Sequence, residues 1–531
     1  MGRMRRKRTQ VPDLGQGCLA LVHSEQPVAT ERPGGRTRFL DDSAHHLRLG
    51  AERLDEYLTA RGLKWVVDLR RELERVDYTG LLVRYESSGR KPYHPRTILG
   101  LIIYGMLCRQ WSLRDLEDLA VRDVGAWWIC GGRQPDHSTI GDFFERHREV
   151  LSEEFCVALV KDLVGRVKLP AGVVAGDGTV VEAAASHHRA LTVEAAQQAA
   201  ERARTRALAA PQDARRQQAL AQTEKVAAVA RARTERRQAK ARPGGPALVA
   251  ASEPEAVVQP RKDGARRPSY KGSILVHEKG LIVAQALHPC SETAVLEPML
   301  DQHREIFTTE PASLLLDAGY NACEPLQMAV ARNIDLLCPS GRSDTNWERK
   351  STEIFGKNAF TYAAQQDVYH CPGGHSLRRI KTGVDRDQRA YRLYGGAPCA
   401  NCALRQRCTR SRTGRTLNRY DGEEFKDAMA EVMRQPAARR KFRCRRIVER
   451  PFAEFRMRHG FTRFHRRGPA GARLEFALHC IAFNLKWAVS HRGADSPVIF
   501  CALICSSRER VLHISATVFV ITRGIAVGSG A

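Results

Sequence analysis

The sequence predicts a mixed α/β protein with an all-helical N-terminal domain and a cysteine-rich insertion. Three observations support this prediction. Residues 94–163 contain several segments whose apolar residues recur at helical spacing, as in helices that pack on a core. Residues 173–186 and 313–320 instead carry short runs of β-branched and aliphatic residues, which are typical of strands. Residues 343–425 interrupt the alternation of helix and strand with polar sequence and a group of cysteines.

The composition indicates a large and strongly basic protein. The chain has 531 residues, of which 43% are hydrophobic, so it can bury at least one large core and divide into several domains. Its formal net charge is +26, and a basic excess of this size attracts polyphosphates through the release of counterions. A nucleic acid is therefore the first partner to consider, although other anions attract basic proteins too.

The sequence shows neither a secretion signal nor a membrane span. The start, MGRMRRKRTQVPDLGQG, is basic but lacks the apolar stretch that a secretion signal requires. The best apolar candidate, Val498 to Cys505, is far shorter than the roughly 20 residues of a membrane helix. We therefore expect a cytoplasmic protein. Most of its 15 cysteines stand singly, as Cys108, Cys156 and Cys480 do, which indicates reduced thiols.

Shifts in composition divide the chain into five parts. We expect a helical domain over residues 1–165, the first part of an α/β core over 166–342, the cysteine-rich insertion over 343–425, the rest of the core over 426–490 and a tail of unclear structure over 491–531. Ser112 and the segment PDHST resemble helix N-caps in the first part. Its short helices fit either a DNA-binding helix-turn-helix or a plain bundle.

The first part of the core contains an insertion at about residues 190–268. The insertion begins with strong helix formers rich in Ala, Arg, Gln and Glu and ends in a tract rich in Pro, Gly and Ser. We expect an exposed charged helical arm, and a helix that contacts phosphate is the alternative. Residues 270–289 then indicate two strands joined by a Lys-Gly turn.

Two aspartates stand where the sequence predicts strands. Asp177 lies between glycines in VVAGDGTVVEAAAS, which we expect to be a strand entering a turn, and Asp317 ends the run SLLLD. A charge in such an apolar context is costly unless it has a function, although Gly-Asp-Gly is also common in ordinary turns. Clustered carboxylates are the ligands that hold pairs of Mg²⁺ ions for phosphodiester cleavage.

A third carboxylate lies in the segment KFRCRRIVERPFAEFRMRHG, and this segment carries a family resemblance. The sequence resembles the DDE transposases of bacterial insertion sequences, in the branch marked by Tyr, Arg, Glu and Lys with two, three and six residues between them. Phe442, Arg445, Glu449 and Arg456 reproduce this spacing, with Phe in place of Tyr and Arg in place of Lys. Helical spacing would place all four on one face, but Pro451 favours a helix that begins near Glu449.

The resemblance extends over about residues 60–490. It includes GDGT, LLLDAGY, the tract HPRTILGLIIYGMLCRQWSLRDLEDLA of the family's helical N-terminal domain, and FTRFHRRG followed by ALHCIAFNLKWA. It implies an RNase H-like catalytic core, a mixed sheet flanked by helices, with the two aspartates on strands and the glutamate on a later helix. It also implies a transposase that binds terminal inverted repeats and moves its element by cleavage and strand transfer.

The resemblance also implies roles for individual residues. Asp177, Asp317 and Glu449 would hold Mg²⁺ or Mn²⁺, and Arg445 and Arg456 would bind DNA phosphates, since Arg offers a planar fork to two oxygens. The alternative for the two arginines is a solvated basic helix face. The expected partners are double-stranded DNA, as inverted repeats and as target, and a second copy of the chain bound to DNA, in the cytoplasm at the nucleoid.

Three further residues stay open at this stage. Glu454 is the rival for the third carboxylate. Tyr320 and Trp487 could stack on an unpaired base at the transposon end, but packing in a core is the better explanation for each of them.

The cysteines of the insertion have a spacing that suits a metal. Cys371, Cys399, Cys402 and Cys408 form the pattern C-x27-C-x2-C-x5-C, and four soft ligands with one close pair favour tetrahedral zinc. His370 or His375 could replace one of the cysteines. A structural zinc site and unligated cysteines both remain compatible with the sequence.

Two other classes of protein remain open. A regulator built on the helical domain would bind DNA without cutting it, and a metal-dependent nuclease would hydrolyse DNA without strand transfer. The order Asp, Asp, Glu across α/β elements favours the transposase over the regulator. The absence of Tyr at position 442 and the tail without a pattern are also compatible with an inactive copy.

Overall fold

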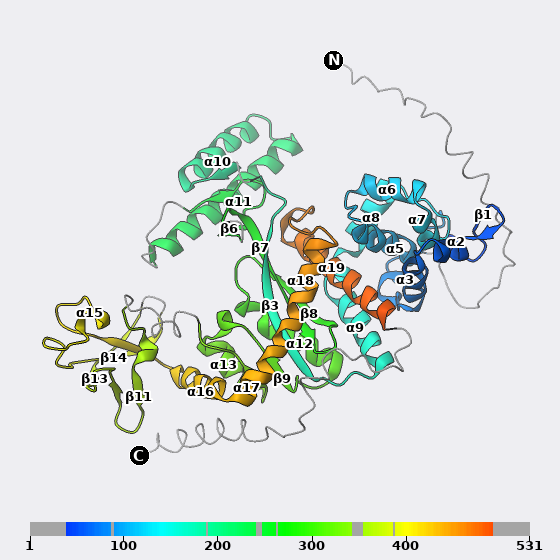
Figure 1. Cartoon of the computed structure of the whole chain (residues 1–531). Coiled ribbons are helices and arrows are strands. Elements are labelled where there is room, and N and C mark those ends of the chain that lie inside the picture. The colour runs from blue at the N-terminus through cyan, green and yellow to red at the C-terminus, as the bar shows by residue number, and fades with distance from the viewer. Residues whose placement is uncertain are drawn as a thin grey trace. The chain divides into compact units, whose positions relative to one another are not determined.

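A computed structural model describes residues 39–491 except 87–89, 187–188, 240–246, 262–263, 342–353 and 386–387. The expected tail beyond residue 491 lies outside the described residues. The chain forms two compact units (Figure 1). The first contains the chain up to Val167, Ala453–His465 and a segment that begins at Arg473, and the second contains Lys168–Phe452 with Arg466–Ala472. The segment 426–490, expected to complete the core, is therefore shared between the two units.

The second unit is built on a mixed sheet of eight strands. In chain order they are β3 (Val173–Glu182), β4 (Ala190–Leu191), β5 (Val249–Ala250), β6 (Val257–Pro260), β7 (Arg266–His277), β8 (Ile282–His288), β9 (Ser313–Leu315) and β10 (Asp335–Leu337). Their order in the sheet is β10-β9-β3-β7-β6-β5-β4, and β8 also pairs with β7. The two strands expected over residues 270–289 are confirmed as the antiparallel pair β7 and β8.

The structure corrects the expectation that Asp177 lies at a turn. β3 continues through Gly176, Asp177 and Gly178, and these residues pair in register with Leu275, Ile274 and Ser273 of β7. The long antiparallel partner outweighs the local preference of glycine for turns, because every residue from Val174 to Glu182 gains a pairing position. Asp177 therefore lies in the middle of a strand, where the sheet fixes its backbone.

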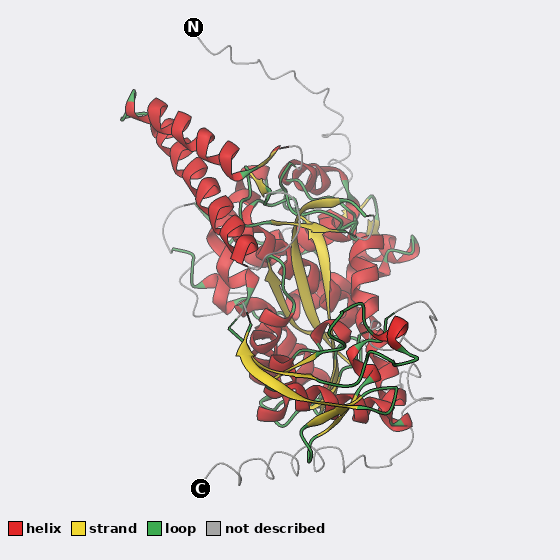
Figure 2. Ribbon diagram, turned by 90° about the vertical axis from the view of Figure 1, so that its left-hand side faces the viewer, coloured by secondary structure: helices red, strands yellow, loops and turns green. Residues whose placement is uncertain are grey.

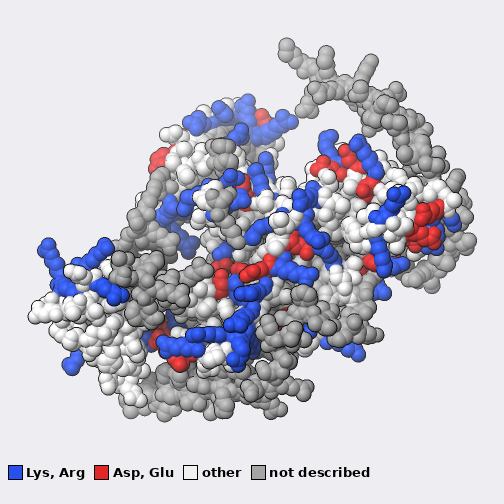
Figure 3. Space-filling model, viewed as in Figure 1, with Lys and Arg blue, Asp and Glu red and all other residues white. Residues whose placement is uncertain are grey.

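Among the described residues, six helices accompany this sheet, and the first two of them belong to the charged insertion. They are α10 (Val193–Leu208), α11 (Ala214–Ala239), α12 (Leu296–Phe307), α13 (Cys323–Ala331), α16 (Glu423–Arg434) and α17 (Pro436–Phe442), with 3-10 turns η2 (Thr293–Val295), η3 (Ala318–Tyr320) and η5 (Arg443–Val448). As expected, the charged first part of the insertion is helical, but the tract rich in Pro, Gly and Ser that follows is not a loose linker, because it contributes β5, β6 and the start of β7 to the sheet. α10 and α11 pack side by side through alanines (Figure 2), and Lys and Arg side chains gather over them on the face drawn in Figure 3.

The cysteine-rich insertion folds as a separate small sheet of five antiparallel strands. They are β11 (Thr361–Ala363), β12 (Val368–His370), β13 (Ser376–Val384), β14 (Ala390–Gly395) and β15 (Leu417–Tyr420), accompanied by η4 (Lys357–Ala359) and α15 (Arg405–Cys408). An aromatic cluster that includes Phe355, Phe360, Tyr369 and Tyr394 forms its core. The sequence did not predict these strands.

Over its described residues, the first unit is helical apart from the short pair β1 (Arg48–Leu49) and β2 (Glu52–Arg53). Its helices are α2 (Leu54–Ala60), α3 (Lys64–Arg75), α4 (Thr79–Leu82), α5 (Pro95–Leu107), α6 (Leu113–Arg122), α7 (Val124–Cys130), α8 (His137–Ser152), α9 (Glu154–Val167) and the later parts of α18 (Glu449–Met457) and α19 (Gly468–Ser490). The expected N-caps are confirmed, since Ser112 accepts from the N–H of Asp115 and Asp136 from that of Thr139. Among the described helices, none combines the length and hydropathy needed to cross a membrane.

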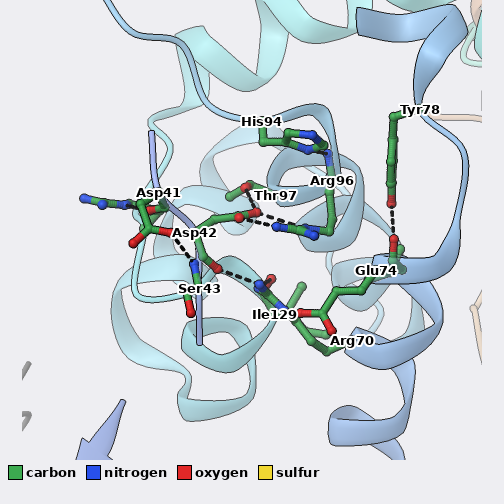
Figure 4. Close-up of polar contacts among 12 residues, drawn as sticks. Asp41, Asp42, Ser43, Arg70, Glu74, Tyr78, His94, Arg96, Thr97 and Ile129 are labelled. Carbon is green, nitrogen blue, oxygen red and sulfur yellow. Dashed lines mark hydrogen bonds and ion pairs between the residues drawn. The ribbon is translucent and has the colours of Figure 1, made fainter. Parts of the chain in front are cut away.

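A buried polar cluster joins several segments of the first unit (Figure 4). The Asp42 carboxylate accepts hydrogen bonds from the guanidinium of Arg96 and from the hydroxyl of Thr97 at 2.7 Å. Arg70, which is only 1% exposed, donates to the carbonyl oxygens of Asp42, Trp128 and Ile129. Burial opposes ionisation of Asp42, but the hydrogen bonds and charges of the arginines lower its pKa below the ordinary value.

Candidate active site

The mixed sheet brings the two predicted aspartates together. β9 runs parallel to β3, with Val174 opposite Leu314 and Ala175 opposite Leu315. Asp177 and Asp317 each lie two residues beyond the last of these pairs, so they occupy equivalent positions on adjacent segments. Asp317 follows the end of its strand and caps η3, where its Oδ1 accepts the N–H of Gly319 at 2.9 Å. The fold thus fixes both backbones at one place on the sheet.

The side chain of Arg445 lies between the two carboxylates. Its Nη2 atom is 3.0 Å from Oδ2 of Asp177 and 3.5 Å from Oδ2 of Asp317. Arg445 belongs to η5, which packs against β3 and β7, and its side chain is 16% exposed. In this structure the residue predicted to bind DNA phosphate is the counterion of both aspartates.

The surroundings of Asp177 disfavour its charged form. Burial raises the pKa of this carboxyl, and the nearby carboxylates of Asp317 and Glu292 raise it further. The charge of Arg445 and a hydrogen bond from the N–H of Gly178 lower it, but the net shift is upward. An ionised Asp177 is therefore a charge that the fold leaves incompletely compensated.

The sequence analysis missed a further carboxylate at this place. Glu292 precedes η2 and forms an ion pair with Nζ of Lys271 at 2.7 Å. A Cβ atom on Gly178 would lie 2.8 Å from its Oε2, and one on Gly319 would lie 2.7 Å from its Oε1. The available signal was the glycine near each aspartate, in GDG and in DAG, because such glycines leave space for another side chain.

Several buried polar atoms near the carboxylates have no hydrogen-bond partner within the part of the chain that the structure describes, apart from a contact between the hydroxyls of Tyr320 and Ser273. They are the hydroxyls of Tyr320 and Ser273 and Nε of Arg445, and Tyr320 and Ser273 are both 0% exposed. Burial raises the pKa of Tyr320 far above its ordinary value, and the charges of Glu292, Asp177 and Asp317 add to this. Unpaired polar atoms of this kind are rare in folded proteins and often mark a functional site.

Glu449 starts α18, with Pro451 in the first turn, as the sequence analysis expected for this segment. Its side chain is exposed, and it enters none of the ion pairs of the described residues. It directly follows η5, the turn that carries Arg445. The rival Glu454 lies in the first unit and forms an ion pair with Lys486 of that unit.

Arg456, Tyr320 and Trp487 also have definite positions. Arg456 is half-buried on α18 within the first unit. Tyr320 is fully buried beside the carboxylates. Trp487 is 6% exposed and stacks on His491, with 4.1 Å between the ring centroids.

The four predicted zinc ligands gather at one end of the small sheet. Cys371, Cys399, Cys402 and Cys408 line the same cavity, together with His375. Its volume of about 20 Å³ is room for little more than one water molecule or ion. Burial raises the pKa of the Cys408 thiol, Arg415 lowers it, and the other three thiols raise it, so all four sulfur atoms lie within electrostatic range of one another.

None of the groups of three or more His, Cys, Asp and Glu side chains in the described ranges has the arrangement of a preformed metal site. At the aspartates, the guanidinium of Arg445 lies between the two carboxylates and partly neutralises them without metal. At the cysteines, the four side chains line one small cavity.

The α/β unit thus brings two aspartates together, one on β3 and one just beyond the end of β9. Comparison with known families gives two matches: residues 370–488 match a family described as "Transposase DDE domain", and residues 54–146 match one described as "Transposase domain (DUF772)". No curated protein matches the chain. The two matches support a DDE transposase, and enzymes of this class generally use divalent metal ions. The first match includes Glu449 and the four cysteines, whereas Asp177 and Asp317 lie outside both.

Proposed function

We propose that this chain is the transposase of an insertion sequence, which cleaves DNA at the terminal inverted repeats and transfers the cut ends to a target. The observation that carries the proposal is the pair Asp177 and Asp317, in register on adjacent segments and facing one shared cation. The arrangement of the mixed sheet supports an RNase H-like core as the catalytic scaffold, with the helical first unit as the DNA-binding domain.

The residues present fit divalent metal ions. Carboxylate oxygens are the ligands that Mg²⁺ and Mn²⁺ prefer, and a guanidinium already takes the place of a cation between the two aspartates. Asp177, Asp317 and Glu449 would hold the ions. When bound, two such ions activate a water molecule or a DNA 3′-hydroxyl and stabilise the leaving oxygen.

The chain's own residues must rearrange for this function. Arg445 must leave the aspartates, and a DNA phosphate is a suitable new partner because Arg binds two phosphate oxygens at once. Asp177 must bind the ions in its ionised form, which its buried surroundings disfavour. Glu449 must turn inward from its exposed position at the start of α18, next to the turn that carries Arg445.

Basic surfaces of the chain fit DNA as the partner. α10 and α11 carry a series of exposed arginines on one helical pair (Figure 3), and such side chains neutralise backbone phosphates without reading the sequence. Arg456 would add a contact from α18. We include in the proposal a homodimer on double-stranded DNA, acting at the nucleoid.

The four cysteines would hold a structural zinc ion. Thiolates at C-x2-C spacing are the usual ligands of such ions, and Cys371, Cys399, Cys402 and Cys408 share a cavity of suitable size. The small sheet has only a limited apolar core around Phe355 and Tyr394. A metal would therefore stabilise a region that has few other buried contacts.

The proposed function is tested with labelled DNA that carries the element's own ends, in Mg²⁺ or Mn²⁺. We expect Asp177→Asn, Asp317→Asn and Glu449→Gln each to lower cleavage by about a thousandfold or more while end binding persists. Glu454→Gln is the matched control and should cut normally. A loss in Glu454→Gln with normal cutting by Glu449→Gln would move the third carboxylate.

The same experiment separates the alternatives. Binding of the ends without cleavage by the intact chain would indicate a regulator or an inactive copy, for which Phe442 in place of the family's Tyr gives a reason. Hydrolysis of the ends without joining to target DNA would indicate a nuclease.

A further inference from the structure

We propose that Glu292 is an additional ligand of the divalent ions at this site, beside Asp177 and Asp317. The inference rests on the proposed function, because it assigns a further residue to the same metal site. Glu292 comes from the turn between β8 and α12, so it adds a third, independent segment to the two that carry the aspartates.

The carboxylate of Glu292 reaches both aspartate segments. Its Oε2 lies 2.8 Å from the place of a Cβ on Gly178, the residue after Asp177. Its Oε1 lies 2.7 Å from the place of a Cβ on Gly319, and Oδ1 of Asp317 lies 3.0 Å from the same point. The side chain of Glu292 is 15% exposed, so it is held at the site rather than extended into solvent.

The two glycines make this approach possible. Neither Gly178 nor Gly319 has the positive φ that requires glycine for backbone reasons. A methyl group at either position would overlap a carboxylate oxygen of Glu292. Glycine at these places therefore keeps space for Glu292, which is a reason for GDG and DAG that is independent of turns.

Buried hydroxyls near the cluster supply a second observation. Tyr320 and Ser273 are fully buried, and apart from a contact between their two hydroxyls these oxygens have no hydrogen-bond partner among the described residues. Tyr320 is within electrostatic range of all three carboxylates, and the Ser273 hydroxyl lies near Gly178 beside Oε2 of Glu292. The water molecules that surround a bound Mg²⁺ or Mn²⁺ are donors and acceptors that would satisfy such hydroxyls.

The charges at the site also match this role. Three carboxylates face two cationic side chains, because Lys271 pairs with Glu292 and Arg445 pairs with both aspartates. The two cations compensate the three carboxylates only in part without metal. Divalent ions would replace them, so Glu292 and the aspartates form one set of ligands with two exchangeable counterions.

The test measures Mn²⁺ binding to the full chain without DNA, by calorimetry and by electron paramagnetic resonance of free Mn²⁺. We expect Glu292→Gln to weaken the binding of at least one Mn²⁺ by about tenfold or more, in the same direction as Asp177→Asn. Glu305→Gln is the matched control, since Glu305 is an exposed residue of α12. Circular dichroism verifies that each variant is folded.

Two further variants test whether Glu292 is a metal ligand or only the ion-pair partner of Lys271. Lys271→Met removes the same ion pair but leaves the carboxylate, so it should bind Mn²⁺ at least as tightly as the parent chain. Gly178→Ala should weaken Mn²⁺ binding, because its methyl group displaces Glu292. Equal weakening by Lys271→Met and Glu292→Gln would overturn the inference and make Glu292 a structural partner.

The outcomes distinguish this inference from the proposed function. Normal Mn²⁺ binding by Glu292→Gln together with weak binding by Asp177→Asn and Asp317→Asn would reject only the assignment of Glu292 as a metal ligand. No effect of either aspartate variant on Mn²⁺ binding, or no binding by the parent chain, would reject both the metal site and the additional ligand.

Discussion

Asp42 in the helical unit and Asp177 in the mixed sheet are both buried aspartates beside arginines, yet their surroundings have opposite effects. Asp42 accepts hydrogen bonds from Arg96 and Thr97, and its pKa lies below the ordinary value (Figure 4). The pKa of Asp177 is raised although Arg445 lies 3.0 Å away. The charge of the aspartate is thus compensated by its neighbours in the helical unit and incompletely compensated in the mixed sheet.

The difference lies in the neighbours of each ion pair. Around Asp42, Arg70 donates to three main-chain carbonyl oxygens and pairs with Glu74. Around Asp177, a second and a third carboxylate share the available cations, and the hydroxyl of Tyr320 has no partner among the described residues other than the hydroxyl of Ser273. In the cluster around Asp42, the residues satisfy one another's hydrogen bonds and charges. Around Asp177, some charge is left uncompensated and can be compensated by a bound ligand.

The largest effect expected from this comparison is on stability. Arg70→Met should lower the free energy of unfolding of the first unit by about 3–5 kcal/mol, because it leaves buried carbonyls and carboxylates without their donor. Denaturant unfolding followed by tryptophan fluorescence measures this, since Trp65, Trp127 and Trp128 lie in that unit.

The control for Arg70 is Arg71→Met on the same helix. Arg71 is 54% exposed and pairs only with Asp68 in the described ion pairs, so its loss should cost less than about 1 kcal/mol. Equal losses for the two variants would break the comparison, because the Asp42 cluster would then not be a structural one.

The sequence predicted those parts of the fold that depend on neighbours along the chain. Ser112 caps its helix through a residue three positions away, and the helix that begins at Glu449 follows from Pro451. Both effects are local, so the residue types are sufficient. Asp317 was placed correctly after a strand for the same reason, since an apolar run ends there.

Features that depend on distant partners were missed. β13 has mostly exposed residues, so no apolar alternation marks it, and only pairing with β12 and β14 makes it a strand. The strand that carries Asp177 was expected to enter a turn there because Gly-Asp-Gly favours one locally, but β7 supplies a full partner. Glu292 stands in SETAVLEPM without any local sign of function, and only the fold places it beside both aspartates.

A smaller effect is expected at Arg445. Removal of its charge by Arg445→Met should strengthen Mn²⁺ binding by about tenfold, because the guanidinium competes with the metal for Asp177 and Asp317. The same variant should weaken binding of DNA ends, if Arg445 moves to a phosphate. Calorimetry with Mn²⁺ and a gel-shift measurement with end DNA test the two effects separately.

Arg446→Met is the control for Arg445. Arg446 is the exposed neighbour on η5, so its loss removes the same charge without changing the contacts of the aspartates. Unchanged Mn²⁺ affinity in Arg445→Met would mean that the guanidinium does not compete with the metal. The difference between Asp42 and Asp177 would then no longer indicate a metal site.

The smallest expected effect is on the unfolding temperature when Asp177 or Asp42 is replaced by asparagine, and the two replacements should change it in opposite directions. Burial raises the pKa of Asp177 above the ordinary 3.8, so its ionised form costs stability at neutral pH and this cost disappears as the pH falls through the raised pKa. Asp177→Asn should therefore raise the unfolding temperature of the metal-free chain at neutral pH, provided that Asp317 keeps Arg445 compensated. The lowered pKa of Asp42 means that its ionised form stabilises the fold above pH 3.8. This contribution is lost as the pH falls through the lowered pKa. Asp42→Asn should therefore lower the unfolding temperature at neutral pH.

Unfolding temperatures of the parent chain and both variants, measured with a chelator from neutral to acidic pH, test these signs. The gain in Asp177→Asn and the loss in Asp42→Asn should both shrink toward acid, since protonation makes each parent aspartate neutral like asparagine. A loss of stability in Asp177→Asn at neutral pH would show that the ion pair with Arg445 outweighs burial. Asp177 would then resemble Asp42, and the raised pKa would no longer support a site prepared for a metal ion.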